Sequence, residues 1–578
     1  MSVAALDRLK PLQPRRFVPE RIDLGDWAQL EPLLQRLDAE GAELPDAQAL
    51  EAWLLRVSEF GAALYQEEAR RYINMTCQTD DPASEAAFLA FVEQIEPRLK
   101  PWLQKLDQRY LACPHRAKLP PSRYEVFDRD TRKDVELFRE ENVPLQTEQA
   151  KLAQQYQKTM GAMTVTFRGE ELTVLQAGRY LEEPERATRE QVYRLISERR
   201  LQDRERIEEL YEQLLGLRER IGRNAGFGSF REYAFKSNSR FDYTPADCEA
   251  FHDAVERHVV PLARKLQERR RRIMGLEQLR PWDLGVDPRG RPPLRPFQGA
   301  QELAEKSHEI FRRIDPSLGD DFKILIEREL LDLESRKGKA PGGYQHSLEE
   351  ARLPFIFMNA VGLQRDVQTL LHEGGHAFHA LAMRQEPLLS YRHPPLEFCE
   401  VASMSMELLA GPHLEVFYAK ENADRARRTH REEIVALLPW IATIDAFQHW
   451  VYTHAGHTRA ERRDAWLATR RRFGGIEDWS GLEEAEACLW HKQGHLFGAP
   501  FYYIEYGIAQ LGALQVWLNY LNDPRRALAQ YRAGLALGRS RPLPELFAAA
   551  GIRFDFSAAA VKPLAEVLER ELARLEEA

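Results

Sequence analysis

Hydrophobic residues recur at helical spacing along most of this chain. Apolar side chains at i, i+3, i+4 and i+7 form the buried face of a helix, and helix starts carry signals such as Thr244-Pro245. We predict helices over about 25–40, 46–75, 84–112, 146–162, 187–223, 245–274, 299–313, 365–385, 396–420, 425–455, 459–472, 482–492, 504–521, 524–535 and 559–577. The predicted fold class is therefore mainly α.

Strand-like patterns are confined to two places. Short runs on either side of Gly169, at 165–167 and 171–174, predict a small hairpin. A second group lies just before the helix predicted over 365–385 and consists of 322–326, 331–336, 342–346 and 355–358. We predict a small β-sheet there. An exposed edge along Phe355–Met358 would offer backbone groups to an extended peptide, and Gly342-Gly343 would allow close backbone approach.

The pentapeptide His372-Glu373-Gly374-Gly375-His376 lies in the helix predicted over 365–385. A helix places His372 and His376 one turn apart on the same face, so both imidazoles can reach one tetrahedral zinc ion at about 2.0–2.1 Å. Glu373 points off that face and is better placed as a base than as a ligand. The glycines cost on the order of 1 kcal/mol each relative to alanine, so we expect close approach of something such as a substrate backbone. The alternative is a helix with two histidines and no metal.

A third metal ligand is expected on the helix that follows Pro394-Pro395. A catalytic zinc site needs three protein ligands and one open position. Glu400 is the preferred candidate, with Glu397 and His393 as rivals. Glu407 shares a helix face with Glu400, so it is expected to support the ligands from outside the coordination shell.

Composition indicates an ordinary globular protein, with 578 residues, a net charge of −9 and 30% charged residues. The Arg269–Arg272 run fits a helical pattern and is interpreted as a solvated face, so no nucleic-acid partner is predicted. No run of 18 apolar residues occurs, so no membrane span is predicted. The sequence gives no information on oligomeric state.

The five cysteines are scattered, odd in number and without a C-x-x-C pair. This pattern favours reduced thiols and a cytoplasmic location, and the first residues lack an apolar core long enough for a signal peptide. Cys399, beside Glu400, is expected to be buried packing. His379, one turn after His376, is likewise expected to pack rather than to bind metal.

The two histidines, followed by Glu397-Phe-Cys-Glu400-Val-Ala-Ser-Met-Ser-Met-Glu407, resemble the zinc oligopeptidases typified by thimet oligopeptidase. The resemblance is strongest to their bacterial branch, oligoendopeptidase F and Pz-peptidase. It extends through 241–245, 281–284, 336–344, 354–359 and 500–507, and covers roughly 120–578. It implies Glu400 as the third ligand of one zinc per chain. It also implies a multi-helical, two-lobed clam that encloses a deep channel, with the small sheet beside the zinc helix.

The resemblance also assigns roles to a histidine and tyrosines near the C-terminus. His495, with Tyr503 or Tyr506, would donate hydrogen bonds to the tetrahedral oxyanion, a group that peptide hydrolysis must stabilise. The gap from His495 to these tyrosines is one residue shorter than in the animal members, so the choice of tyrosine stays open. Tyr502 is expected to contact substrate.

Gly343 and Phe357 are expected to contact substrate as well. The predicted activity is that of a zinc endopeptidase acting on short peptides, in which Glu373 takes a proton from a zinc-bound water and returns it to the leaving amine. A zinc carboxypeptidase on a similar helical fold is the alternative, and a peptide-binding protein with a structural metal is a non-enzyme rival.

An N-terminal helical region, 1–200, is expected to precede a catalytic region, 201–578.

Overall fold

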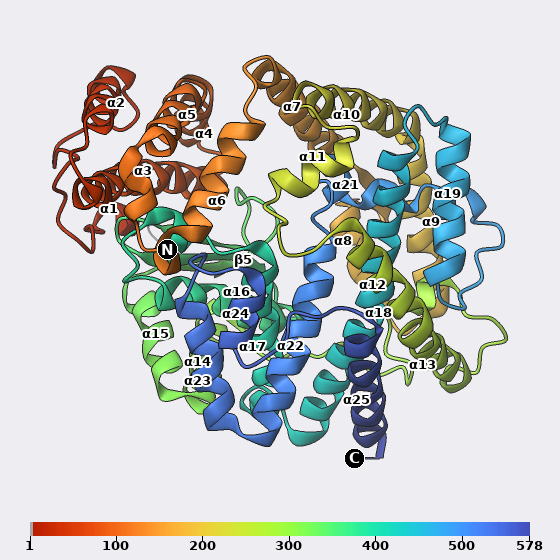
Figure 1. The fold of residues 1–578 in the computed structure, drawn as a ribbon. Coiled ribbons are helices and arrows are strands. Elements are labelled where there is room, and N and C mark those ends of the chain that lie inside the picture. The colour runs from red at the N-terminus through yellow and green to blue at the C-terminus, as the bar shows by residue number, and fades with distance from the viewer. Residues whose placement is uncertain (1–3, 578) are drawn as a thin grey trace. The chain divides into compact units, whose positions relative to one another are not determined.

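The computed structural model describes residues 4–577 and is mainly helical, as predicted (Figure 1). The chain forms two compact units. The first unit comprises the residues through Glu136, Arg295–Ala423 and Gly512–Phe554, and the second comprises Leu137–Leu294, Asp424–Leu511 and the residues from Asp555 onward. The division into regions 1–200 and 201–578 stays a prediction; its boundary falls inside helix α9.

The helices have the following bounds. The first unit contains α1 (Ala4–Asp7), α2 (Trp27–Ala42), α3 (Ala47–Cys77), α4 (Pro82–Ala90), α5 (Glu96–Ala112), α6 (Pro121–Leu137), α14 (Gly299–Ile314), α15 (Pro316–Glu327), α16 (Gln364–Ala382), α17 (Leu396–Leu409), α23 (Pro524–Ala536) and α24 (Leu543–Ala549). The second unit contains α7 (Asn142–Gly161), α8 (Val174–Gly178), α9 (Arg186–Gln202), α10 (Arg204–Asn224), α11 (Phe230–Ser237), α12 (Pro245–His258), α13 (Val260–Ile273), α19 (Arg459–Phe473), α20 (Glu483–Ala487), α21 (Gly494–Gly498) and α25 (Ala558–Glu577). Helices α18 (Lys420–Thr453) and α22 (Ile504–Asn522) contain residues of both units, and α6 ends at Leu137, the first residue of the second unit.

A three-stranded sheet lies beside α16, as predicted (Figure 1). Its strands are β3 (Leu331–Glu334), β4 (Tyr344–Leu348) and β5 (Leu353–Ala360), in the order β3-β5-β4. β5 is parallel to β3 and antiparallel to β4. The prediction of an exposed edge along Phe355–Met358 is therefore wrong, because β5 is the central strand and is paired on both sides. The edges of this sheet are β3 and β4.

The strand predicted over 322–326 is also wrong, because this segment lies in α15. Asp315 caps that helix by accepting a hydrogen bond from the N–H of Ser317 at 2.8 Å, and Pro316 occupies the first turn, where proline is tolerated. Leu318, Phe322 and Leu325 are buried at helical spacing. The hairpin is confirmed as β1 (Thr164–Phe167) and β2 (Glu170–Thr173) in the second unit.

Two features of the second unit bear on the predicted partners. α18 is the one helix within residues 4–577 that is long and apolar enough to cross a membrane, but 72% of its apolar window is buried, which accounts for its composition.

The Arg269–Arg272 run makes ion pairs with glutamates of the same unit, among them Glu268 and Glu432. These arginines are therefore engaged within the fold.

Candidate functional site

His372, His376 and Glu400 meet at one point of the first unit. Nε2 of His372 lies 3.4 Å, and Nε2 of His376 lies 3.6 Å, from Oε2 of Glu400. Ligands about 2.0–2.1 Å from a tetrahedral ion are about 3.3–3.4 Å from each other. The three donor atoms are thus already spaced for one zinc ion, and two imidazoles with one carboxylate are a donor set typical of catalytic zinc.

Gly375 allows close packing of the two helices that carry the candidate ligands, and Gly374 allows close packing against α14. A Cβ added at Gly375 would lie 2.5 Å from Cα of Ser403 and 2.7 Å from the carbonyl oxygen of Ala402, both in α17. A Cβ at Gly374 would lie 2.6 Å from the ring of Phe311 in α14. The protein's own helices therefore make the close approach that we expected at these glycines. A substrate backbone is not required to explain why glycine occupies these two positions.

Hydrogen bonds fix the orientation of two of the ligands. Nδ1 of His372 lies 2.7 Å from Oε1 of Glu407. Since a carboxylate only accepts, the proton is on Nδ1, and in the neutral ring this leaves the lone pair of Nε2 for a metal. The hydroxyl of Ser403, one turn after Glu400, donates to Oε2 of Glu400 at 3.0 Å.

The rival ligands lie outside this group. Neither Glu397 nor His393 belongs to the cluster of donor atoms; the ring of His393 packs against Tyr65 at 5.1 Å between centroids. His379 is buried against Phe398, as expected for a packed histidine. Cys399, expected to be buried packing, is only partly buried.

Burial and neighbouring charges shift the pKa values of the site. For His372, burial opposes protonation, but hydrogen bonds and charge from Glu400 and Glu407 outweigh it and raise the pKa well above its usual range. For His376, burial lowers the pKa to about 4. Burial alone would raise the pKa of Glu400, but His376 and His372 outweigh it and lower the pKa to about 2. Burial raises the pKa of Glu373 to about 7. A carboxylate poised near neutrality suits a general base.

The edge strand β4 contacts Glu373 directly. The backbone N–H of Gln345, in β4, donates to the Glu373 carboxylate. The neighbouring Tyr344 stacks on Phe357 with centroids 4.8 Å apart, and its hydroxyl lies 2.6 Å from Oγ1 of Thr76. Phe357 is fully buried beneath it, so it supports Tyr344 and is not positioned to touch a substrate. Gly343 lies directly before this strand.

The predicted oxyanion donors form an aromatic cluster in the second unit. The ring of His495 lies 5.4 Å from Tyr502, 5.0 Å from Tyr503 and 5.9 Å from Tyr506, between centroids. Nδ1 of His495 is 2.8 Å from Nε2 of Gln493. Tyr503 is buried and precedes the first residue of α22, whereas Tyr502 and Tyr506 are half-buried.

The turn that presents these tyrosines is held in a strained conformation. Phe501 has a φ of 64°, a left-handed value that is rare for a bulky side chain. Its N–H donates to Oε1 of Gln448 at 2.6 Å, and its carbonyl accepts from the guanidinium of Arg240. A strained backbone conformation persists only where surrounding contacts hold the residue in place, and such conformations are typical of functional segments.

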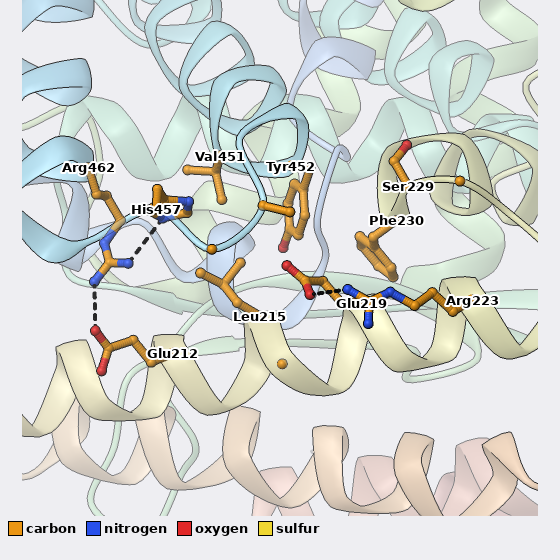
Figure 2. Close-up of a pocket in the computed structure, with 14 residues that line it drawn as sticks. Glu212, Leu215, Glu219, Arg223, Ser229, Phe230, Val451, Tyr452, His457 and Arg462 are labelled. Carbon is orange, nitrogen blue, oxygen red and sulfur yellow. Dashed lines mark hydrogen bonds and ion pairs between the residues drawn. The ribbon is translucent and has the colours of Figure 1, made fainter.

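A separate pocket of about 230 Å³ also lies in the second unit (Figure 2). Its wall includes α10 and the end of α18, and Arg462 on α19 lies beside Glu212 and His457. None of the predicted site residues lines this pocket. It is thus distinct from the candidate metal centre.

Comparison with known proteins identifies the family. Residues 179–566 match the family model described as peptidase family M3, and residues 18–138 match the peptidase M3 N-terminal domain. Oligopeptidase PepF of Bacillus subtilis (strain 168) is 22% identical over 361 residues, which are 61% of this chain and 52% of that protein. An oligoendopeptidase F homolog of Lactococcus lactis subsp. lactis (strain IL1403) is 23% identical over 214 residues, which are 36% of this chain and 32% of that protein. The chain thus spans about half the length of the first relative and about a third of the second.

Solved structures extend the likeness over nearly the whole chain. A protein described as an oligoendopeptidase F has a TM-score of 0.89 at 30% identity, covering 97% of this chain and 99% of that one. Pz peptidase A with an inhibitor has a TM-score of 0.90 at 28% identity, with the same coverage of both chains. The family model alone spans more than half of this chain, and the predicted resemblance is confirmed: the chain belongs to peptidase family M3.

Proposed function

We propose that this protein is a zinc-dependent endopeptidase that hydrolyses internal bonds of short oligopeptides. The observation that carries the proposal is the spacing of His372, His376 and Glu400, at 3.4 and 3.6 Å between donor atoms, with Glu373 on the same helix. The relatives named oligopeptidase or oligoendopeptidase support the substrate class.

When bound, zinc polarises a scissile carbonyl and lowers the pKa of a water molecule toward about 7. His372, His376 and Glu400 hold the ion, while Glu407 fixes the ring of His372. Glu373 accepts the proton of the attacking water and delivers it to the leaving amine. Its burial keeps the carboxylate basic enough for this task, with a pKa of about 7 before metal binds.

An extended substrate would dock on β4 rather than on β5. The other side of β4 is already paired with β5, from Tyr344 to Leu348. Gln345 of β4 lies opposite Ile356 of β5, and its N–H donates to the Glu373 carboxylate. A peptide added along this edge would therefore present its backbone beside the proposed base. Gly343 directly precedes this strand, and the lack of a side chain there would favour close backbone approach.

His495 and one of the tyrosines would complete the reaction by donating to the oxyanion as the tetrahedral centre forms. Tyr506 is the better donor candidate, because its side chain is half-buried and that of Tyr503 is buried. Tyr502, also half-buried, would contact the substrate.

Cleavage of end-blocked peptides separates this function from the alternative carboxypeptidase. We expect comparable turnover of one short peptide with free ends and of the same peptide acetylated and amidated, and loss of both activities on chelation. Release of single C-terminal residues from the free peptide, with no cleavage of the blocked one, would overturn the endopeptidase assignment in favour of a carboxypeptidase.

Selectivity for short chains, a cytoplasmic location and an enclosed channel remain predictions. The cytoplasmic location is supported by the scattered, odd number of cysteines in the sequence. For size selectivity, a reduced and denatured protein and its tryptic fragments should be digested side by side. We expect cleavage of the fragments alone, and rapid cleavage of the full-length denatured chain would contradict a channel that admits only short peptides.

A further inference from the structure

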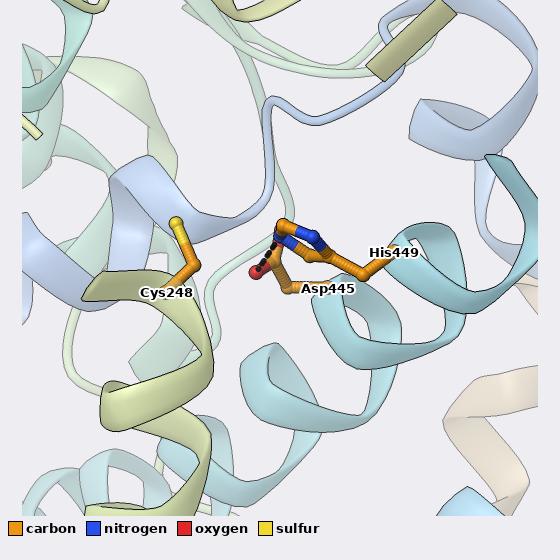
Figure 3. A group of neighbouring side chains, drawn as sticks. All are labelled: Cys248, Asp445 and His449. Atoms are coloured by element: carbon orange, nitrogen blue, oxygen red, sulfur yellow. Dashed lines mark ion pairs between the residues drawn. The ribbon is translucent and has the colours of Figure 1, made fainter. Parts of the chain in front are cut away.

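Four side chains of metal-binding type meet in the interior of the second unit. Cys248 and His252 lie one turn apart on α12, and Asp445 and His449 lie one turn apart on α18. Their exposed fractions are 0%, 2%, 0% and 5%, respectively. Figure 3 shows Cys248 on one helix, close to the Asp445–His449 pair on the other. Each of the two helices thus contributes two donor side chains, spaced i, i+4, to one buried site.

The donor atoms are close enough to share one ion. One donor atom from each of Cys248, Asp445 and His449 lies within 4.8 Å of the others. Their common centre is therefore within about 2.8 Å of every donor, a small rearrangement from the 2.0–2.3 Å of zinc bonds. Nε2 of His449 is already 3.3 Å from Oδ2 of Asp445, the spacing of two ligands on one tetrahedral ion.

Hydrogen bonding leaves part of this cluster unsatisfied. Oδ1 of Asp445 and Nε2 of His449 are buried and have no hydrogen-bond partner among residues 4–577. Nε2 of His449 still has an ion-pair distance of 3.3 Å to Oδ2 of Asp445. Buried polar atoms nearly always have a partner, so the unpaired Oδ1 of Asp445 needs an explanation. His252 is engaged, since its Nε2 lies 2.8 Å from Oδ2 of Asp445.

We propose that Cys248, Asp445 and His449 bind a second zinc ion, with His252 orienting the Asp445 carboxylate. Carboxylate ligands at metal sites are usually hydrogen-bonded by a neighbouring group, and His252 supplies that contact to Asp445. Thiolate sulfur, imidazole nitrogen and carboxylate oxygen are together a donor set that zinc accepts. The thiolate and the carboxylate also balance the two positive charges of the ion, so its burial leaves no net charge inside the unit.

Metal binding would require one contact to change. Nη1 of Arg231 lies 3.3 Å from Nδ1 of His449. With Nε2 on the ion, the ring proton moves to Nδ1, which then cannot accept from an arginine. Arg231 would turn toward Glu249, whose Oε1 is already 3.4 Å away. The same step deprotonates Cys248, whose pKa is raised by burial in the absence of metal.

An ion at this site would also stabilise the turn at Phe501, which precedes Tyr502. The ring of His449 packs edge-on against Phe501, with centroids 5.3 Å apart. Gln448, its neighbour on α18, accepts the hydrogen bond from the N–H of Phe501. An ion that pins α18 to α12 would thereby hold the strained turn before Tyr502 in place.

The test is metal content in a variant that lacks the first site. Glu400→Ala removes a ligand of the active-site metal and leaves the second cluster intact, because the two groups share no residue. After equilibration with zinc and dialysis, we expect about one zinc per chain in Glu400→Ala and about two in the wild type. Adding Cys248→Ala should remove the remaining ion, whereas adding Cys399→Ala should not.

A spectroscopic measurement distinguishes loss of a metal ligand from misfolding of the Cys248 variant. Cobalt should replace zinc in Glu400→Ala and produce a near-ultraviolet thiolate-to-cobalt charge-transfer band, which only a cysteine ligand can give. The band should vanish in Glu400→Ala/Cys248→Ala and persist in Glu400→Ala/Cys399→Ala. A metal-free Glu400→Ala protein, or one that binds cobalt without this band, would overturn the proposal. These outcomes are independent of peptide turnover, so they do not depend on the proposed function.

Discussion

The carboxylate of Glu407 holds the ring of His372 from the side opposite the metal position, with Oε1 2.7 Å from Nδ1. The two residues are on different helices, α16 and α17, so the hydrogen bond ties the orientation of one ligand to the helix that carries Glu400. A carboxylate in this position raises the basicity of the ligating nitrogen and fixes the ring. The site should therefore be sensitive to Glu407 even though this residue is not a ligand.

Glu407→Gln keeps the size of the side chain and loses its charge. We expect zinc affinity to fall by about 10- to 100-fold, the usual cost of losing such a partner, as measured by competition with a chelator. Glu397→Gln, on the same helix and outside the donor cluster, is the matched control and should change affinity by less than about threefold. Equal losses in both variants would contradict the assigned roles of Glu407 and Glu397.

Gly375→Ala should separate the two ligand helices. The new Cβ would meet backbone atoms of Ser403 and Ala402 at 2.5 and 2.7 Å, which cannot move aside as a side-chain end can. We expect a loss of about 1–3 kcal/mol in unfolding free energy, as for other overpacked interiors, together with weaker zinc binding. Chemical denaturation with and without zinc provides both readouts.

Gly216→Ala is the control for that experiment. Gly216 lies in the helix α10, and a Cβ there would have no atom within 4 Å. Alanine should therefore stabilise the protein by roughly 0.4–1 kcal/mol through helix propensity and unfolded-state entropy. Destabilisation at Gly216 as large as that at Gly375 would mean that the close contact between α16 and α17 is not the cause.

Zinc binding should release protons near neutral pH. The pKa of His372 is well above its usual range in the metal-free protein, so the ring is protonated at pH 7 and must lose that proton before Nε2 can bind metal. We expect release of at least about one proton per zinc at pH 7, and affinity should fall by roughly tenfold for each pH unit below this. Calorimetry in buffers of different ionisation enthalpy measures the number directly, and binding without proton release would be inconsistent with this prediction.

The two tyrosines of the C-terminal cluster should differ in their kinetic effects. Tyr506→Phe is expected to lower kcat by about a hundred- to a thousandfold with little change in KM, as for loss of an oxyanion donor. Tyr503→Phe removes a hydroxyl that Trp440 and Gln493 already engage. It should cost about 0.5–1.5 kcal/mol of stability and leave kcat nearly unchanged. The reverse pattern would assign the donor role to Tyr503.

Periodicity predicted most of the helical architecture because burial at 3.6-residue spacing is a local property. It failed at 322–326, where apolar and β-branched residues resemble a strand, although Asp315-Pro316 is a readable helix start. Strand order is not local. The sequence places the β5 segment next to α16, but only the fold shows that β4 pairs with it and takes the edge that faces Glu373.

The cluster of the candidate metal ligands was predictable because these residues are close in sequence, with His372 and His376 one turn apart and Glu400 on the next helix. The role of Gly374 and Gly375 was misinterpreted, since a glycine pair indicates close approach without naming the partner. The cluster of Cys248 with Asp445 could not be found from spacing, because only the packing of α12 and α18 joins residues so far apart in the chain. The sequence shows which of these residues can bind metal, but it does not show which of them the fold brings together.

The central claim is that Glu373 is the base of a zinc peptidase and not a ligand. Zinc content and turnover of an end-blocked short peptide should be measured on the same preparation of Glu373→Gln, with wild type in parallel. We expect unchanged zinc content and a kcat reduced by at least about a hundredfold, the low end for loss of a general base. A Glu373→Gln protein that keeps its zinc and still turns over the peptide at a rate near that of wild type would contradict it.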